Sequence, residues 1–317
     1  MLLTSGKALW QRRAGVKEPA PYCAYIRKVE LSLAFSPCPN DAYVFAAWAQ
    51  GLLPNAPPVR VVVDDAETLN LAALDERYAV TKVSYGAVPA LLDRYRVLRA
   101  GGALGRGCGP LVVAKRGDDG VAPTLTQLGQ DARYAIPGAM TTAHLLLRLA
   151  LGGEVNASTL RFDRVVDAVA AGDYDAGLLI HEARFSYEQA GLACVADLGA
   201  WWESATKHPI PLGAIVAHRD LDAESIRQIE DGIRTSLRFA RDHEEAVMPY
   251  VRERAQESDE AVIRAHIDLY VNDHTEDVGE DGIAAVRELF DRAARAGLIP
   301  DRVPVGRLPP VHELQRH

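Results

Sequence analysis

The sequence has few of the features that mark exported, membrane or nucleic-acid-binding proteins. Four cysteines occur in 317 residues, with no C-x-x-C pair and no spacing typical of a disulfide framework, which favours a reducing compartment such as the cytoplasm. Acidic residues outnumber basic ones, 43 to 35, and the net charge is −8. Because nucleic-acid-binding surfaces need clustered Lys and Arg, nucleic acid is not an expected partner.

Long apolar runs are also missing. No stretch approaches the ~20 apolar residues that span a bilayer, so we expect no membrane insertion. Residues 1–28 contain Trp10, Arg12, Arg13 and several prolines, but not the continuous apolar segment of a secretory signal. We therefore expect a cytoplasmic protein in which residues 1–28 form a loosely ordered N-terminal extension.

The overall composition is that of a globular protein, with 48% hydrophobic and 25% charged residues. A chain of 317 residues is long for one core, so two domains are expected. Strand and helix patterns alternate, which predicts an α/β fold. Gly-containing connections at 105–110 and 209–213 indicate two crossovers. They predict a discontinuous domain 1 (29–113 with 214–317), a domain 2 (114–213) and a helical C-terminal segment.

Polar residues follow two of the predicted strands of domain 1. Residues 29–35 alternate as in a strand and lead into Ser36-Pro-Cys-Pro-Asn-Asp41. Ser36 and Asn40 can either cap the next helix or contact a ligand, and Asp41 is an alternative cap. The run 80–84 repeats this pattern, which predicts that Lys82 and Ser84 face a cleft, although a lysine at a strand end is more often a solvated surface charge.

A second βαβ series starts at Tyr134. The turn Pro137-Gly138 precedes Thr141 and Thr142, either of which can cap a helix over 144–150. The free N–H groups and positive dipole end of a helix start attract a carboxylate. The same pattern also begins ordinary helices, so it does not identify a site by itself.

The apolar run 176–180 is bounded by charge and predicts a buried parallel strand that ends at His181. In open α/β sheets, ligands bind outside the carboxyl ends of strands. Imidazole also titrates near neutral pH. His181 is therefore the main candidate for chemistry.

Several catalytic motifs are excluded by their context. The segment 105–110 is not a dinucleotide fingerprint, because a strand rather than a helix follows Pro110. The pairs His181-Glu182 and His243-Glu244 both lack the second histidine of the zinc helix motif. No metal is therefore expected.

Two further groups are set aside on the sequence alone. Cys38 lies between two prolines and has no basic neighbour in the sequence to activate it as a nucleophile. His243, His266 and His274 show no metal-ligand spacing, so a structural role is expected for them. The remaining pattern is a two-lobed α/β cleft for a small polar or anionic molecule, which fits a solute receptor as well as an enzyme.

Five segments then match the motifs of one known family. They are Ser36-Pro-Cys-Pro-Asn-Asp41, Thr81-Lys-Val-Ser84, 101–107 with 109–114, Ile180-His-Glu182 and Asp197-Leu-Gly-Ala-Trp-Trp202. In these segments the chain resembles the 1,4-dihydroxy-6-naphthoate synthases of the futalosine route to menaquinone. The resemblance extends from about Val29 to about Leu298.

This resemblance implies a periplasmic-binding-protein-like fold of type II, with a ligand cleft between its domains. It also implies a cofactor-independent cytoplasmic lyase that converts cyclic de-hypoxanthinylated futalosine to 1,4-dihydroxy-6-naphthoate. His181 matches the family's proton-accepting histidine. The substrate-contacting residues of the family match Lys82, Val83 and Ser84 in one run, and Thr142 and Ala143 in another.

The chain departs from the family pattern before its Thr-Thr pair, where Ala139-Met140 replaces the usual Arg-His. The helix start or Lys82 is expected to take over any role of those side chains. Two alternatives stay open: a solute-binding protein of the same fold, which normally needs export, and the sister enzyme of the pathway that dehydrates a chorismate derivative. A small-molecule substrate is the expected partner in the main interpretation, and the sequence leaves the oligomeric state open.

Overall fold

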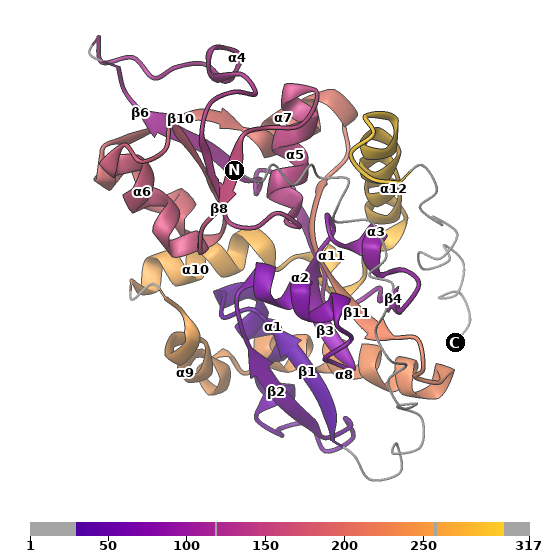
Figure 1. Cartoon of the computed structure of the whole chain (residues 1–317). Helices are drawn as coiled ribbons and strands as arrows, with labels where there is room; N and C mark the ends of the chain where they lie inside the picture. Colours follow the sequence, from indigo (N-terminus) through magenta and orange to yellow (C-terminus); the bar gives the residue numbers. More distant parts are fainter. Residues whose placement is uncertain (1–29, 118, 257–258, 301–317) are drawn as a thin grey trace.

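The computed structural model describes residues 30–117, 119–256 and 259–300. The extension predicted for 1–28 and the helix start predicted at Ser258 lie outside these ranges. Within them the chain forms two sheets with helices packed around both, and the two sheets lie at opposite ends of the molecule in Figure 1. No helix in the described ranges is both long and apolar enough to cross a membrane.

The first sheet has six strands in the order β2-β1-β3-β11-β4, and β5 also pairs with β11. Strand β1 is parallel to β2 and β3, whereas β11 runs antiparallel to its neighbours. The Val-rich β2 illustrates the preference of β-branched residues for strands. The strands are β1 (Leu31–Phe35), β2 (Val59–Val63), β3 (Val80–Ser84), β4 (Tyr95–Val97), β5 (Ala103–Gly105) and β11 (Ile210–His218).

The second sheet has five strands in the order β10-β6-β9-β7-β8. Strand β9 is parallel to β7, as predicted for a parallel sheet, but antiparallel to β6. All four residues of β9 are buried, which explains its uninterrupted apolar sequence. The strands are β6 (Leu111–Lys115), β7 (Tyr134–Ile136), β8 (Ala157–Thr159), β9 (Ala176–Leu179) and β10 (Leu192–Asp197).

The helices begin and end at recognisable signals. Thr141 caps α5, Asp222 caps α8, and Gly152 in a left-handed conformation ends α5. The α-helices are α1 (Pro39–Ala49), α2 (Ala66–Leu74), α3 (Val88–Leu91), α4 (Leu125–Leu128), α5 (Thr142–Leu151), α6 (Val165–Ala171), α7 (Leu198–Thr206), α8 (Ala223–Asp242), α9 (Glu244–Arg254), α10 (Glu260–Tyr270), α11 (Asp273–Glu276) and α12 (Gly279–Arg295). Three 3₁₀ helices are η3 (Phe162–Arg164), η4 (His181–Phe185) and η5 (Tyr187–Ala190).

The chain passes from one sheet to the other twice, between β5 and β6 and again between β10 and β11. The predicted domain boundaries, after 113 and before 214, fall within β6 and β11. The division into two domains remains a prediction, but the two sheets and the connections between them are present.

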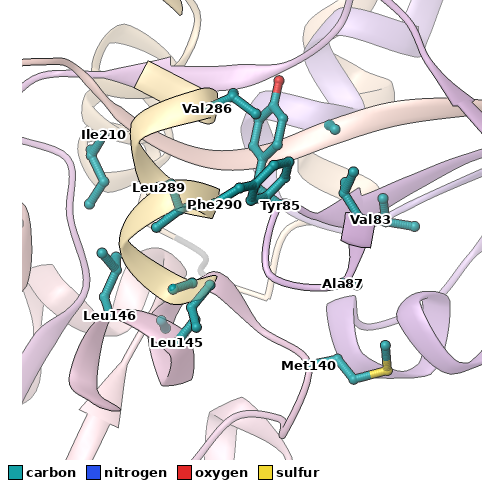
Figure 2. Close-up of a cluster of buried hydrophobic side chains, with 14 of the residues drawn as sticks. Val83, Tyr85, Ala87, Met140, Leu145, Leu146, Ile210, Val286, Leu289 and Phe290 are labelled. Carbon is teal, nitrogen blue, oxygen red and sulfur yellow. The ribbon is translucent and has the colours of Figure 1, made fainter. Parts of the chain in front are cut away.

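The C-terminal helices pack against both parts of the molecule. Helices α8, α9 and α10 lie against α1, while α12 contacts β11 and α5. Figure 2 shows Leu289 and Phe290 of α12 beside Leu145 and Leu146 of α5, with Tyr85 nearby. These side chains belong to one apolar cluster that includes residues from both sheets. The helical tail therefore helps to hold the two sheets together.

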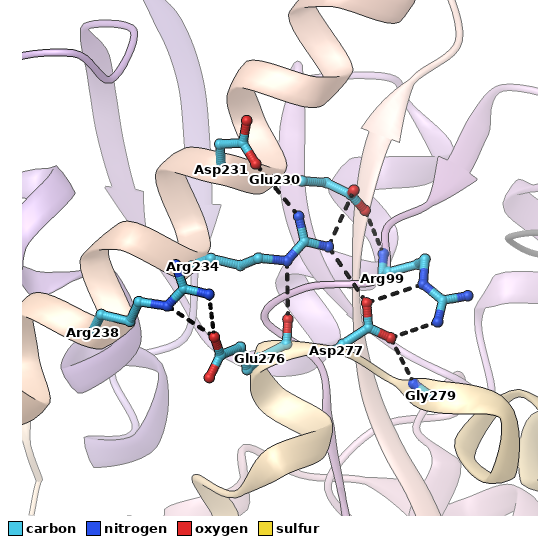
Figure 3. Close-up of polar contacts among 8 residues, drawn as sticks. All are labelled: Arg99, Glu230, Asp231, Arg234, Arg238, Glu276, Asp277 and Gly279. Atoms are coloured by element: carbon cyan, nitrogen blue, oxygen red, sulfur yellow. Dashed lines mark hydrogen bonds and ion pairs between the residues drawn. The ribbon is translucent and has the colours of Figure 1, made fainter. Parts of the chain in front are cut away.

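A network of ion pairs fixes the segment between α11 and α12 against α8 (Figure 3). Arg99 donates from Nη2 to Oδ1 of Asp277 at 2.6 Å and from Nε to Oδ2 at 3.1 Å. Arg234 of α8 approaches the same carboxylate at 3.6 Å, and Arg238 contacts Glu276. The partly buried carboxylate of Asp277 thus joins the turn after β4 to the tail.

Candidate active site

A cavity lies at the strand ends between the two sheets. It holds about 770 Å³ of space, its open mouth included, which is within the size range of small-molecule sites. Strands β3, β9 and β11, helices α5 and α10 and the segment between β5 and β6 contribute to its wall. All residues predicted for the site line it: Ser36, Asn40, Lys82, Val83, Ser84, Thr141, Thr142, Ala143 and His181.

His181 follows β9 and begins η4. Its φ of 59° lies in the left-handed region, which side-chain-bearing residues rarely adopt and which is often found at functional sites. Burial lowers the pKa of His181 to about 4; Asp41 opposes the shift and Lys82 adds to it. The imidazole is therefore neutral at pH 7. Its Nε2 is buried without a hydrogen-bond partner among the described residues.

Cys38 contacts the other nitrogen of this imidazole. Its Sγ lies 2.9 Å from Nδ1 of His181, and its side chain is almost fully buried. The interpretation that Cys38 has no basic partner is therefore wrong. The partner comes from a strand end 143 residues later in the chain, so no local pattern could reveal it.

Lys82 is not a solvated surface charge. Its Nζ lies 2.5 Å from Oδ1 of Asp41, and the two side chains are only 10% and 3% exposed. Oδ2 of Asp41 accepts a 2.6 Å hydrogen bond from Oγ of Ser36, and Nδ2 of Asn40 donates to Oδ1 at 3.0 Å. Cys38, and neither Asn40 nor Asp41, is the residue that precedes the first turn of α1. The prediction of side-chain capping at α1 is thus wrong, because both side chains belong to the cavity wall.

His266 is a second histidine of the cavity, although only a structural role was predicted for it. It projects from α10, is 1% exposed, and its Nε2 lies 3.0 Å from Oδ1 of Asn40. Burial lowers its pKa well below the usual value, and electrostatic interactions with His181, Arg184 and Lys82 act in the same direction. Its ring centroid is 4.5 Å from that of Tyr270 and 6.5 Å from that of His181.

The start of α5 brings the two sheets together. Thr142 donates from Oγ1 to the carbonyl of Leu212 at 2.7 Å and accepts from the backbone N–H of Gly86 at 3.0 Å. Its hydroxyl is therefore occupied by backbone groups of β11 and of the segment that follows β3. Thr141 uses its own hydroxyl to cap the backbone N–H of His144. The helix start thus presents backbone rather than hydroxyl groups to a ligand.

The backbone of the Ala139-Met140 pair is held by the carboxylate of Glu67, which lies on α2 beside the first sheet. Glu67 of α2 accepts hydrogen bonds from the backbone N–H of Met140 at 3.1 and 3.2 Å. Burial raises the pKa of Glu67, while its hydrogen bonds with Asn70 and Met140 act against the shift. Asn70 in turn bonds to Ser84, donating to Oγ at 3.1 Å and accepting from N at 2.8 Å. The backbone at Ala139-Met140 is therefore held by its contact with α2.

Sequence reasoning overlooked several residues of the cavity wall. They include Asp41, Arg184, His266 and Tyr270. Asp41 lies inside a recognised motif and Arg184 lies three residues after His181, so both could have been found by position. Nothing in the sequence of α10 distinguishes His266 from a core residue. In the described ranges, no three His, Cys, Asp or Glu side chains are grouped so that they could hold a metal ion.

Comparison with known proteins relates most of the chain to one family. The family model described as "Menaquinone biosynthesis" matches residues 31–295. A 1,4-dihydroxy-6-naphthoate synthase of Thermus thermophilus is 47% identical over 268 residues, covering 84% of this chain and 95% of that protein. The corresponding synthase of Streptomyces coelicolor is 46% identical over 275 residues, covering 85% and 95%.

Solved structures agree with these matches. A protein from Archaeoglobus fulgidus has a TM-score of 0.79 at 36% identity, covering 85% of this chain and 98% of that chain. A Candida albicans protein described as having the generic periplasmic binding protein fold has a TM-score of 0.67 at 14% identity, covering 88% and 93%. These likenesses, with the helical tail, confirm the predicted fold class. The chain belongs to the menaquinone biosynthesis family and, within it, to the 1,4-dihydroxy-6-naphthoate synthases.

Proposed function

We propose that this protein is a cytoplasmic lyase that converts cyclic de-hypoxanthinylated futalosine to 1,4-dihydroxy-6-naphthoate, with His181 as the general base. The observation that carries the proposal is a neutral imidazole in the cavity wall whose Nε2 is left without a partner. A base must be unprotonated before it acts, and burial of His181 meets that condition at neutral pH.

The contact with Cys38 determines which nitrogen acts. If Nδ1 carries the proton and donates to Sγ of Cys38, Nε2 keeps its lone pair for the substrate. Nε2 then removes a proton from the bound substrate. The electron pair released at carbon expels the sugar-derived fragment, and the remaining ring becomes aromatic. The imidazolium afterwards returns its proton to the departing fragment or to water.

The cavity supports this reaction by its electrostatics. Thr142 and Ala143 at the start of α5 line the cavity, and the positive dipole end of this helix would stabilise negative charge that develops on an oxygen nearby. The Lys82–Asp41 pair supplies further dipoles that are held in place before the substrate binds. Such preorganised groups favour the transition state because they need no rearrangement during the reaction.

The test is to incubate the purified protein with the cyclic substrate and to detect dihydroxynaphthoate by mass spectrometry. General-base catalysis contributes roughly 10²–10⁴ in rate, so His181→Asn should lose about that factor in kcat and still bind substrate. Near-normal turnover by the variant would remove His181 from this role. Tight binding of another solute without any product would favour a receptor, and dehydration of a chorismate derivative would favour the sister enzyme.

A further inference from the structure

The cavity wall contains two cationic side chains, Lys82 and Arg184. They differ in how their charge is compensated. Lys82 lies 2.5 Å from the carboxylate of Asp41, so this pair is close to neutral as a unit. Arg184 forms no ion pair with any carboxylate among the side chains that the structure describes; its Nη1 donates to the carbonyl of Gly109 at 3.0 Å. The wall therefore carries one positive charge without a protein counter-ion in the described ranges.

Arg184 is placed beside the reacting group. It follows His181 by three residues within η4, which is one turn of a 3₁₀ helix. Both side chains line the same cavity. An anion held by Arg184 would thus be attached about one helical turn from the imidazole that we propose as the base.

The guanidinium is held by a rigid part of the backbone. A Cβ at Gly109 would lie 2.2 Å from Cα of Gly199, so the two glycine backbones pack directly against each other. Only glycine permits this approach. The close packing fixes the position of the Gly109 carbonyl, which accepts the hydrogen bond from Arg184. Because a guanidinium has five N–H donors, donors remain for a ligand beside the bond to Gly109 and the interaction with the hydroxyl of Tyr270.

The proposed reaction supplies the anion. The product 1,4-dihydroxy-6-naphthoate bears a carboxylate on its aromatic ring, and this group takes no part in the elimination. It is therefore available as a fixed handle on both substrate and product. A planar guanidinium matches a carboxylate in a two-bond arrangement that also fixes the plane of the attached ring.

We propose that Arg184 binds the aryl carboxylate of the substrate and thereby sets the position of the reacting ring against His181. The inference rests on the proposed function for the identity of the substrate. Arg184 thus has a positioning and specificity role. Because the anion is held from η4, binding does not require basic side chains at Ala139-Met140, before α5.

The experiment compares Arg184→Met, Arg184→Gln and Arg184→Lys with wild type, and uses Arg287→Met on the exposed face of α12 as the matched control. With the cyclic substrate, the Met and Gln variants should raise KM by roughly 10- to 100-fold, the range expected for loss of charge-assisted hydrogen bonds. The Lys variant should lose less, because it keeps the charge but not the two-bond geometry. The control should behave as wild type.

A binding measurement separates this inference from the proposed reaction. The probes are 6-hydroxy-2-naphthoate and its carboxamide, titrated by calorimetry against each protein. Wild type should prefer the carboxylate, and the Met and Gln variants should lose that preference. If both variants kept it, or if wild type showed none, the inference would be overturned. If the preference behaved as expected but wild type formed no dihydroxynaphthoate, the proposed reaction would fail while the carboxylate site stood.

Discussion

Sγ of Cys38 lies 2.9 Å from Nδ1 of His181, and the two residues are 143 positions apart in the chain. The contact joins the loop before α1 to the end of β9, so it links the first sheet to the second. A partner on one ring nitrogen orients an imidazole and selects its tautomer. In this cavity the thiol takes the place that a carboxylate or backbone carbonyl often occupies next to a catalytic histidine.

We expect Cys38→Ala to lower kcat by roughly 10-fold with little change in KM, because the imidazole loses its orienting partner while the rest of the cavity is kept. Steady-state kinetics measure the effect. Cys38→Ser should recover part of the loss, since a hydroxyl can also accept from Nδ1. Cys194→Ala is the matched control, because Cys194 is exposed on β10. Unchanged turnover in Cys38→Ala would show that the thiol contact does not orient the base.

The pH dependence of the reaction tests the state of His181. Burial lowers the pKa of this histidine to about 4, and a general base acts only when unprotonated. Activity should therefore stay level as the pH falls from 8 to 5 and decline, with a slope of one proton, toward pH 4. The measurement is kcat/KM against pH, which reports the free enzyme. An inflection near the ordinary imidazole value of ~6.5 would mean that His181 is solvated or that another group is the base.

Local patterns were sufficient to place Lys82, Thr141 and His181 in one cavity, because each follows or precedes a predictable strand or helix. The partners of these groups were not predictable. Lys82 is neutralised by Asp41, 41 positions away, and Asn40 meets His266 across 226 positions. Such pairs depend on how two sheets and a helical tail are brought together, which no periodicity encodes. The same holds for the C-terminal segment, which was predicted to be helical although the contact of α8 with α1 was not predicted.

Removal of one member of the buried Lys82–Asp41 pair should lower the free energy of unfolding strongly, whereas replacement of both members should lower it much less. Asp41→Asn leaves a nearly buried ammonium without its anion, and removal of one partner of such a pair costs about 3–5 kcal/mol of stability. The double variant Asp41→Asn with Lys82→Met should recover much of that loss, because no unpaired charge remains. Urea denaturation of both variants measures the difference. Equal stability of the single and double variants would show that the ammonium is solvated.

In the ion-pair network of Figure 3, loss of the Asp277 carboxylate should lower the free energy of unfolding, whereas loss of the Asp231 carboxylate should hardly change it. Asp277 accepts two hydrogen bonds from Arg99, whose side chain is 12% exposed, and it also faces Arg234. Asp277→Asn therefore leaves two poorly solvated guanidinium groups without their shared anion, and we expect a loss of about 1–3 kcal/mol in unfolding free energy.

Asp231→Asn is the control: Asp231 pairs with Arg234 at 3.6 Å, but its side chain is 77% exposed. A surface pair of this kind contributes about 0–1 kcal/mol. Urea unfolding at low and high salt distinguishes the two, because screening weakens exposed pairs more than buried ones. If both variants lost the same small amount, Asp277 would be acting as an ordinary surface charge.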